Sequence, residues 1–347
     1  MIVKKRLLLV GAGRIAKVHV GSIAKLPNAY VAAVADPDEC AGTAMATALG
    51  CAWFDSFQSA LVGCEFDGVV IAAPTALHAS LLEDCARAGL PVFCEKPIDL
   101  SLDRVDQCLR IVRSAGIPVV MGFHRRFDRS RIEAKAAVDS GSVGRMEHIL
   151  QISRDPRLPS ESFLSHSGGI VRDMLIHDLD ELLWLCGTKA VTVQASLSRM
   201  VDPPLLERYS DYDTAAVTVV FDDGPLCQIA ATRRSAYGFE QRLEVFGDQG
   251  LLVCPSPKRT DMIIASAHGF VEAPLVDYLL ERYCDAYFAE MRHFVAVIEG
   301  LESSRSTAEE ARCSLALAEC VIESARTGKS VHAMDLRHSA DIDPNRN

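Results

Sequence analysis

The hydrophobic residues of the first third of the chain fall into short runs that alternate with helical patterns. The apolar runs are RLLLV, YVAAVA, GVVIAA, PVFC and IPVVMG, each of strand length. Between them, AGTAMATALG, LLEDCARAGL and LDRVDQCLRIVRSAG favour helices. Strands that alternate with helices predict a parallel sheet with helices on both faces and ligands at the carboxyl ends of the strands. Residues 1–122 are therefore predicted to form a doubly wound α/β domain.

The pattern changes after residue 122. Longer alternating runs, including DTAAVTVVF, LCQIAATR and RLEVFG, are separated by the turn sequences DDGP and DQG. They predict a large, mostly antiparallel open sheet. Helical patterns extend from about residue 170 to Cys186, just before Gly187, and over roughly residues 277–300 and 307–328. We expect a second, α+β domain at residues 123–335 and a polar tail at 336–347.

The amino-acid composition supports two packed domains and indicates the cellular compartment. The chain has 347 residues, of which 49% are hydrophobic and 24% charged, and its longest apolar runs are too short for a transmembrane helix. A net charge of −10 disfavours nucleic acid as a partner. The twelve cysteines are scattered, with no Cys-x-x-Cys pair, and no signal-peptide cleavage site follows the N-terminus. These features predict a cytoplasmic protein with reduced thiols and no metal.

A glycine-rich turn follows the first predicted strand and opens a helix. In GAGRIA, Gly11 permits the tight turn, Gly13 lets the backbone approach a pyrophosphate, and Ala16 is small enough for close helix packing. Asp36 ends the next strand, where a carboxylate can accept hydrogen bonds from a ribose and repel a 2′-phosphate. The sequence therefore predicts a Rossmann domain that binds NAD. The alternative is a glycine turn that binds no dinucleotide.

The strand PVFC runs directly into Glu95-Lys96-Pro97. At that sheet edge a lysine can place a cation beside an oxygen that gains negative charge. Proline also restricts Lys96 to an extended conformation. Without this position after a strand, Glu95 and Lys96 would more often be an ordinary ion pair on the protein surface.

The segment DMLIHDLDE, residues 173–181, places a histidine among four carboxylates in an otherwise apolar helical pattern. Helical spacing puts Asp173, His177 and Asp180 on one side. This pattern is compatible with a solvated helix face, a metal site or catalytic groups. A metal site lacks nearby ligands other than His166, whereas a histidine with a carboxylate one turn away suits proton removal from an alcohol.

The ordered set of motifs resembles the glucose-fructose oxidoreductase and inositol dehydrogenase (Gfo/Idh/MocA) family over nearly the whole chain. The motifs are GAGRIAKVH, APTALH (73–78), CEKP, GFHRRFD (122–128), SRDP (153–156), SGGIVRDMLIHDLDELLWL (167–185) and AYGFEQRLEVFGDQG (236–250). The last four together are most similar to its inositol 2-dehydrogenase branch.

The resemblance implies a role for each matched residue. Lys96 would bind the reacting hydroxyl, His177 would act as general acid/base, and Asp173 would polarise and orient the site. The implied cofactor contacts are Gly11, Gly13, Arg14, Ile15, Asp36, Ala73, Pro74, His78, Glu95 and Lys96, and the implied substrate contacts are His124, Arg125, Asp155 and Tyr237. Two departures, Thr75 where the family often has Asn and His124 where it often has Met or Asn, put the substrate's identity in doubt.

The function expected from these motifs is NAD-dependent oxidation of a secondary hydroxyl of a cyclic polyol, with myo-inositol giving 2-keto-myo-inositol. The second domain would then bind substrate and mediate assembly into a homodimer or homotetramer, because an open sheet needs a cover. The alternatives are a dehydrogenase or reductase of another sugar or cyclitol, a non-catalytic NAD sensor, and a subunit whose main role is assembly.

Overall fold

The computed structural model describes residues 4–333 and divides the chain into two compact units. The first unit runs to Arg129 and also includes Tyr283–Cys313, and the second contains Ser130–Arg282 and the chain from Ser314 onward. The chain therefore passes between the units three times. The predicted domains 1–122 and 123–335 stay predictions, and the predicted tail at 336–347 lies outside the described residues.

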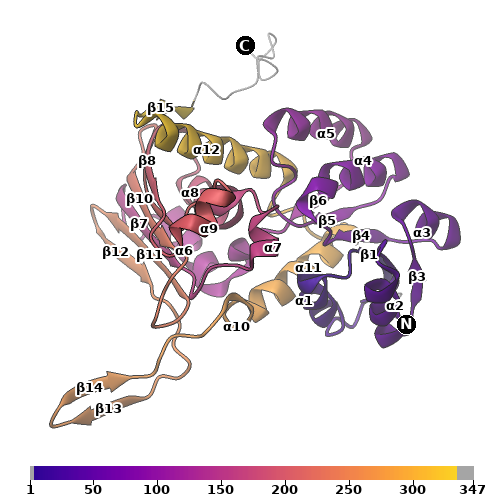
Figure 1. The fold of residues 1–347 in the computed structure, drawn as a ribbon, viewed down its shortest axis with the longest axis horizontal. Coiled ribbons are helices and arrows are strands. Elements are labelled where there is room, and N and C mark those ends of the chain that lie inside the picture. Colours follow the sequence, from indigo (N-terminus) through magenta and orange to yellow (C-terminus); the bar gives the residue numbers. More distant parts are fainter. Residues whose placement is uncertain (1–3, 334–347) are drawn as a thin grey trace. The chain divides into compact units, whose positions relative to one another are not determined.

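The first unit contains a six-stranded parallel sheet in the order β3-β2-β1-β4-β5-β6 (Figure 1). Its strands are β1 (Lys5–Val10), β2 (Ala29–Ala35), β3 (Ala52–Phe54), β4 (Gly68–Ile71), β5 (Val92–Cys94) and β6 (Val119–Met121). The helices between them are α1 (Arg14–Ile23), α2 (Glu39–Leu49), α3 (Phe57–Gly63), α4 (His78–Ala88) and α5 (Leu102–Ala115). The predicted doubly wound α/β fold is confirmed.

Local sequence signals set the helix ends in this unit, as α5 illustrates. The Ser101 hydroxyl accepts the Arg104 N–H at 3.4 Å and satisfies a donor at the start of the helix. At the other end Gly116 adopts a φ of 67°, a left-handed conformation that glycine accepts without strain. Val105, Leu109 and Val112 form the buried face.

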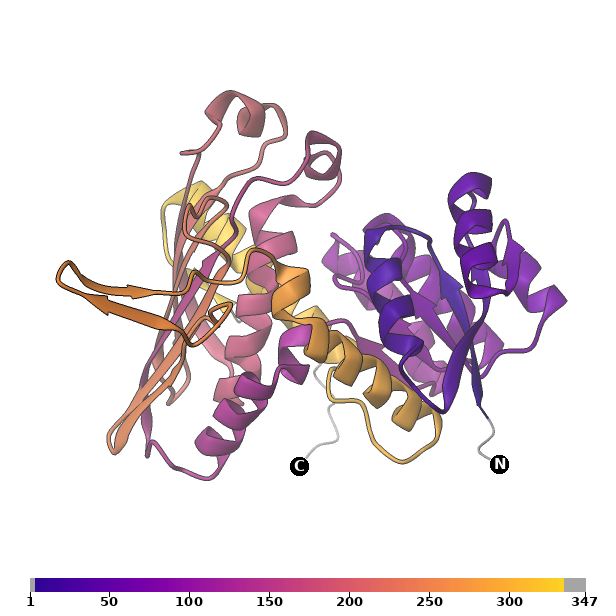
Figure 2. The same ribbon diagram turned by 90° about the horizontal axis from the view of Figure 1, so that it is seen from below.

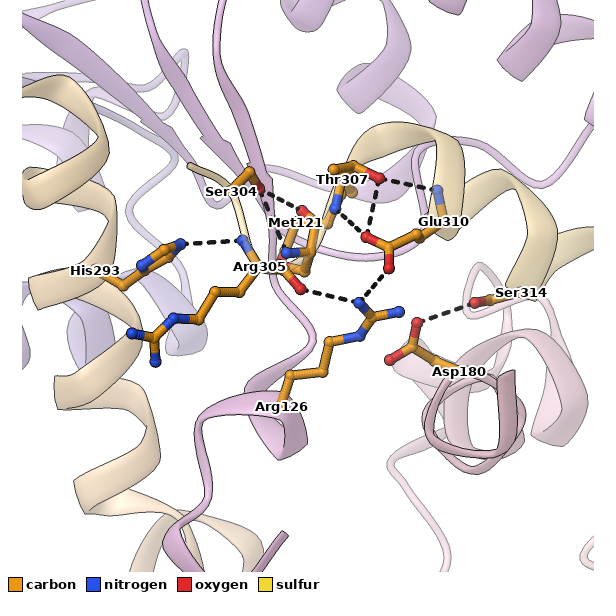
Figure 3. Close-up of polar contacts among 10 residues, drawn as sticks. Met121, Arg126, Asp180, His293, Ser304, Arg305, Thr307, Glu310 and Ser314 are labelled. Atoms are coloured by element: carbon orange, nitrogen blue, oxygen red, sulfur yellow. Dashed lines mark hydrogen bonds and ion pairs between the residues drawn. The ribbon is translucent and has the colours of Figure 1, made fainter. Parts of the chain in front are cut away.

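Helix α11 (Cys284–Ile298) also belongs to the first unit, although it follows the second sheet in the sequence. A Cβ added at Gly68 of β4 would lie 2.6 Å from Ile298 Cδ1, so this glycine lets the helix approach the sheet. The chain then returns to edge strand β6, where the Met121 N–H donates to the Ser306 carbonyl at 2.8 Å (Figure 3).

The second unit is built on a seven-stranded sheet in the order β12-β11-β7-β10-β9-β8-β15. Its strands are β7 (Met146–Arg154), β8 (Ala190–Ser198), β9 (Thr214–Phe221), β10 (Leu226–Thr232), β11 (Glu240–Gly247), β12 (Gly250–Cys254) and β15 (Val331–His332). All neighbouring strands are antiparallel except β7 and β10. The predicted mostly antiparallel sheet is confirmed.

Helices cover one face of this sheet (Figure 2). The helices of the unit are α6 (Arg129–Asp139), α7 (Glu161–Leu164), the π turn η3 (Val171–Leu175), α8 (Ile176–Cys186), α9 (Pro203–Arg208), α10 (Leu279–Arg282) and α12 (Ala308–Thr327); α6 and α12 begin in the first unit. Leu179 and Leu182 of α8 and Val321 of α12 pack with strand residues such as Val217 and Leu243 in one core. The burial of these alternating side chains fixes the register of the strands.

The opposite face of the sheet and a separate hairpin expose apolar side chains. Strands β13 (Ile263–Ser266) and β14 (Gly269–Glu272) pair only with each other and project from the unit (Figures 1 and 2). Phe270 on this hairpin is 80% exposed. Between residues 4 and 333, no helix is both long and apolar enough to cross a membrane.

Candidate functional site

The glycine turn after β1 packs closely against the backbone that follows β4, which only a residue without a side chain allows. Gly11 has a φ of 101°, and a Cβ there would lie 2.5 Å from the Ala72 carbonyl oxygen. Gly13 is the N-cap of α1, and a Cβ there would meet no atom within 4 Å. Arg14 and Ile15 begin the helix with exposed and half-buried side chains. The backbone at this helix N-terminus is therefore open to a pyrophosphate.

Asp36 stands at the carboxyl end of β2, beside the glycine turn. Its Oδ2 accepts the Ala12 N–H at 2.6 Å and its Oδ1 accepts the Asp38 N–H at 2.8 Å. These two bonds fix the direction of the carboxylate. Each carboxylate oxygen can accept further hydrogen bonds, so the group can still bind ribose hydroxyls.

The loop after β4 carries Ala73, Pro74 and His78, all predicted to contact cofactor. The buried His78 ring lies 2.7 Å from both the Ala73 carbonyl oxygen, through Nε2, and the Pro97 carbonyl oxygen, through Nδ1. Burial lowers the pKa of His78, so its neutral ring donates to only one of these oxygens at neutral pH. His78 therefore holds the loop after β4 against the Glu95-Lys96-Pro97 turn, and its predicted contact with cofactor stays a prediction.

Glu95 points into the first unit, whereas Lys96 is half-exposed. Glu95 Oε1 lies 2.8 Å from Nε2 of the fully buried His19, and Glu95 Oε2 accepts the Lys96 N–H at 3.3 Å. Glu95 thereby fixes the backbone that carries Lys96. This geometry supports an indirect role for Glu95, and its predicted cofactor contact stays a prediction.

A second buried carboxyl, Glu290 on α11, interacts with Glu95. Glu290 is fully buried, and neither of its carboxyl oxygens has a hydrogen-bond partner among the described residues. Burial, and then the charge of Glu95, raise the pKa of Glu290 well above its ordinary value. The Glu290 carboxyl therefore favours its protonated form.

Replacing Glu290 by glutamine should stabilise the protein increasingly as pH rises. Below the unfolded-state pKa of about 4.5, Glu290 is protonated in both states. Above it the unfolded chain releases a proton that the native state retains, so the wild type loses about 1.4 kcal/mol of unfolding free energy per pH unit until the native pKa is reached. Urea unfolding of both proteins at pH 5, 6 and 7 measures this difference. A difference independent of pH would show that native Glu290 is not protonated.

His124 and Arg125 follow β6 in the short helix η2 (His124–Phe127) and are almost fully buried. The His124 ring centroid lies 4.4 Å from that of Tyr283 and 5.1 Å from that of Tyr287. The next residue, Arg126, donates to the Arg305 carbonyl at 2.9 Å and to Glu310 at 2.7 Å (Figure 3). His124 and Arg125 follow β6, and the glycine turn follows β1. The carboxyl ends of parallel strands lie at the same edge of a sheet, so these two segments share one edge of the first sheet.

In the second unit, Asp173 and His177 lie where the π turn η3 joins α8. Single π turns inside helices are frequent at functional sites. Both side chains are half-buried, whereas the other acidic residues of the segment are buried. Asp173 Oδ2 accepts from the buried Arg233 Nη2 at 3.3 Å.

The remaining carboxylates of the segment DMLIHDLDE have structural roles. Glu181 pairs with Arg131 Nε at 2.9 Å and accepts the Gln151 amide at 2.8 Å, and Asp178 accepts from the Ser153 hydroxyl. Asp180, expected on the same side as His177, is buried and accepts from Ser314 at 3.1 Å (Figure 3). Buried carboxylates are tolerated when they are paired in this way. They attach α8 to the sheet and to α12.

Asp155 and Tyr237 lie at the end of the second sheet where Arg233 emerges. The Asp155 N–H donates to the Thr232 carbonyl at 2.9 Å, and the Tyr237 hydroxyl donates to Glu240 at 2.5 Å. Asp155 and Asp173 lie at this end because they contact Thr232 and Arg233, which are consecutive residues. Tyr237 lies there because it precedes β11, which pairs with the end of β7. Lys96 belongs to the first unit and His177 to the second.

His19, Glu290 and Arg233 carry no role predicted from the sequence. A signal existed for Glu290, because Tyr287, Met291 and Phe294 place it on the buried face of its helix, where an acid is unexpected. Nothing local marks Arg233, because its partners are distant in sequence. Within residues 4–333, no group of three His, Cys, Asp or Glu residues could hold a metal ion.

Comparison with known proteins matches both halves of the chain. A model of the NAD-binding Rossmann fold of an oxidoreductase family matches residues 5–123, and a model of the GFO/IDH/MocA C-terminal domain matches residues 132–253. Inositol 2-dehydrogenase from Rhizobium meliloti is 37% identical over 318 residues, which cover 91% of this chain and 95% of that protein.

Solved structures with similar folds include two dehydrogenases of different inositol isomers. Myo-inositol dehydrogenase from Corynebacterium glutamicum is 34% identical with a TM-score of 0.90, covering 95% of this chain and 99% of that one. Scyllo-inositol dehydrogenase from Lactobacillus casei, with bound NAD(H) and scyllo-inositol, is 27% identical with a TM-score of 0.89, covering 95% and 99%.

Proposed function

Because this chain belongs to the Gfo/Idh/MocA family and is an NAD-dependent oxidoreductase, we propose that it oxidises a secondary hydroxyl of a cyclic polyol. The proposed reaction converts myo-inositol to 2-keto-myo-inositol. The observation that carries the proposal is the contrast within one helix. Asp178, Asp180 and Glu181 are buried and paired, which leaves Asp173 and His177 as the half-exposed acidic and histidine side chains of that segment.

The proposed chemistry gives each of these residues one role. His177 removes the proton of the reacting hydroxyl, and the anionic Asp173 one turn earlier favours proton uptake by the imidazole. Lys96 donates a hydrogen bond to the same oxygen and stabilises its developing negative charge. NAD, when bound, accepts the hydride from the carbon that bears this oxygen. Arg125, Asp155 and Tyr237, with His124, would bind the other hydroxyls.

The residues around the glycine turn fit NAD. Gly11 makes the tight turn against the Ala72 backbone that a side chain would prevent, no protein atom lies within 4 Å of a Cβ added at Gly13, and the fixed carboxylate of Asp36 suits two ribose hydroxyls. The same carboxylate would repel the 2′-phosphate of NADP. We therefore assign the adenosine ribose to Asp36 and the pyrophosphate to the backbone at Gly13 and Arg14.

Steady-state assays test the proposed function directly. We expect NADH formation with myo-inositol, at a kcat/KM above those for scyllo-inositol, chiro-inositol and glucose, and little activity with NADP. Asp36→Ala should narrow the preference for NAD while leaving the order of the polyols unchanged. A higher kcat/KM with another sugar would contradict myo-inositol as the substrate. NAD binding without turnover of any polyol would favour a non-catalytic NAD sensor.

We also propose that the protein is a homo-oligomer. Val220, Leu226, Phe246 and Leu251 are exposed on the uncovered face of the second sheet, and Phe270 is exposed on the hairpin. A two-stranded hairpin is marginally stable alone, and contiguous apolar surface of this kind marks protein interfaces. A second copy of the chain, as a dimer or tetramer, would cover both.

A further inference from the structure

Arg233 is a fully buried cation that bridges two carboxylates near the proposed catalytic helix. It follows β10 directly and is 0% exposed. Its Nη1 lies 2.6 Å from Asp211 Oδ2, and its Nη2 lies 3.3 Å from Asp173 Oδ2. Each arm of the guanidinium therefore contacts a different carboxylate.

Asp211 connects this bridge to the start of the helical segment. The side chain is buried, and its Oδ1 accepts the N–H of Ile170 and the N–H of Tyr212, both at 2.7 Å. Gly169 has a φ of 82°, and a Cβ there would lie 2.8 Å from Asp211 Oδ1. The glycine therefore permits the carboxylate to hold the backbone immediately before η3.

The bridge fixes Asp173 in two ways. Through Asp211 it holds the backbone three residues before Asp173, and through Nη2 it holds the Asp173 carboxylate itself. The planar guanidinium is suited to contact two carboxylates at once, which the single ammonium of lysine does less well. Asp173 is the more exposed carboxylate, with 22% of its side chain accessible against 2% for Asp211.

We propose that Arg233 is a positioning residue for catalysis, which holds the Asp173 carboxylate in the orientation that His177 requires. The inference rests on the proposed function, because it gives Asp173 a role in turnover. Arg233 has no proposed contact with substrate or cofactor and acts only through Asp173.

A double-mutant cycle tests this role. Arg233→Met alone would leave the buried Asp211 charge unpaired, so each variant also carries Asp211→Asn, whose Oδ1 can still accept both N–H groups. With Asp173 present, adding R233M to D211N should lower kcat roughly tenfold or more. With Asp173→Asn present, the same change should lower kcat less than about twofold, because its target is already removed.

The outcomes separate this inference from the proposed function. Equal losses in both backgrounds would assign Arg233 a purely structural role and overturn the inference. Full activity of D173N alone would instead overturn the proposed role of Asp173, and with it the inference. If R233M with D211N fails to fold, Arg233→Lys serves in its place, with a smaller loss expected only when Asp173 is present. Unchanged KM for NAD and unchanged circular dichroism are the controls.

Discussion

Replacing His177 by alanine should lower kcat for polyol oxidation at least about a hundredfold at neutral pH. The reason is chemical. Hydride leaves a carbon readily only when the attached hydroxyl loses its proton, and His177 is the proposed acceptor of that proton. The half-exposed position of His177 at the junction of η3 and α8 leaves its ring accessible to a ligand. Stopped-flow or steady-state detection of NADH at saturating NAD measures the effect.

A matched histidine variant makes the result specific. His332 is exposed on β15 and has no proposed role, so His332→Ala should retain wild-type turnover. NAD binding by calorimetry should be the same in H177A, H332A and the wild type, because the proposed cofactor contacts lie in the other unit. Wild-type rates in H177A with the preferred polyol would remove His177 from the mechanism.

The second large effect is expected at Lys96, where Lys96→Met should lower kcat roughly a hundredfold to a thousandfold. Methionine keeps the length of the side chain but cannot donate a hydrogen bond to the reacting oxygen. The fixed backbone supports this position, because Glu95 accepts the Lys96 N–H and the His78 ring contacts the carbonyl oxygen of the next residue, Pro97. The kcat of K96M with the preferred polyol measures the loss.

Lys96→Arg is the matched control for charge. It restores a cation with a different shape, so we expect intermediate activity. If K96M raised only the KM for the polyol and left kcat unchanged, Lys96 would bind ground state and transition state equally and would have no specific catalytic role.

Much of the fold could be read from periodicity. The runs RLLLV, YVAAVA and GVVIAA became β1, β2 and β4 of the parallel sheet, because buried parallel strands are apolar on both faces. The alternating run DTAAVTVVF became β9, which has one face in the core. The position of α11 could not be read this way, since its apolar face is equally compatible with either sheet.

Some residues of the candidate site could likewise be identified from local sequence, and others only from the structure. Gly11 and Asp36 were identifiable in sequence, because a tight turn and an acid about one βαβ unit later have a local physical meaning. The segment DMLIHDLDE was recognisable as polar residues on an apolar helix, but periodicity did not distinguish the catalytic candidates from the structural acids. Glu181 is separated from Arg131 by fifty positions, and Asp178 from Ser153 by twenty-five.

The sequence by itself determined the elements, the two kinds of sheet and the residue types for NAD binding and alcohol oxidation. These depend on local conformation and on hydrophobic period. Only the tertiary structure decided which carboxylates are buried and paired in structural contacts, that Glu290 interacts with Glu95, and that Arg233 contacts Asp173. Such roles depend on desolvation and on partners remote in sequence, and both are properties of the packed chain.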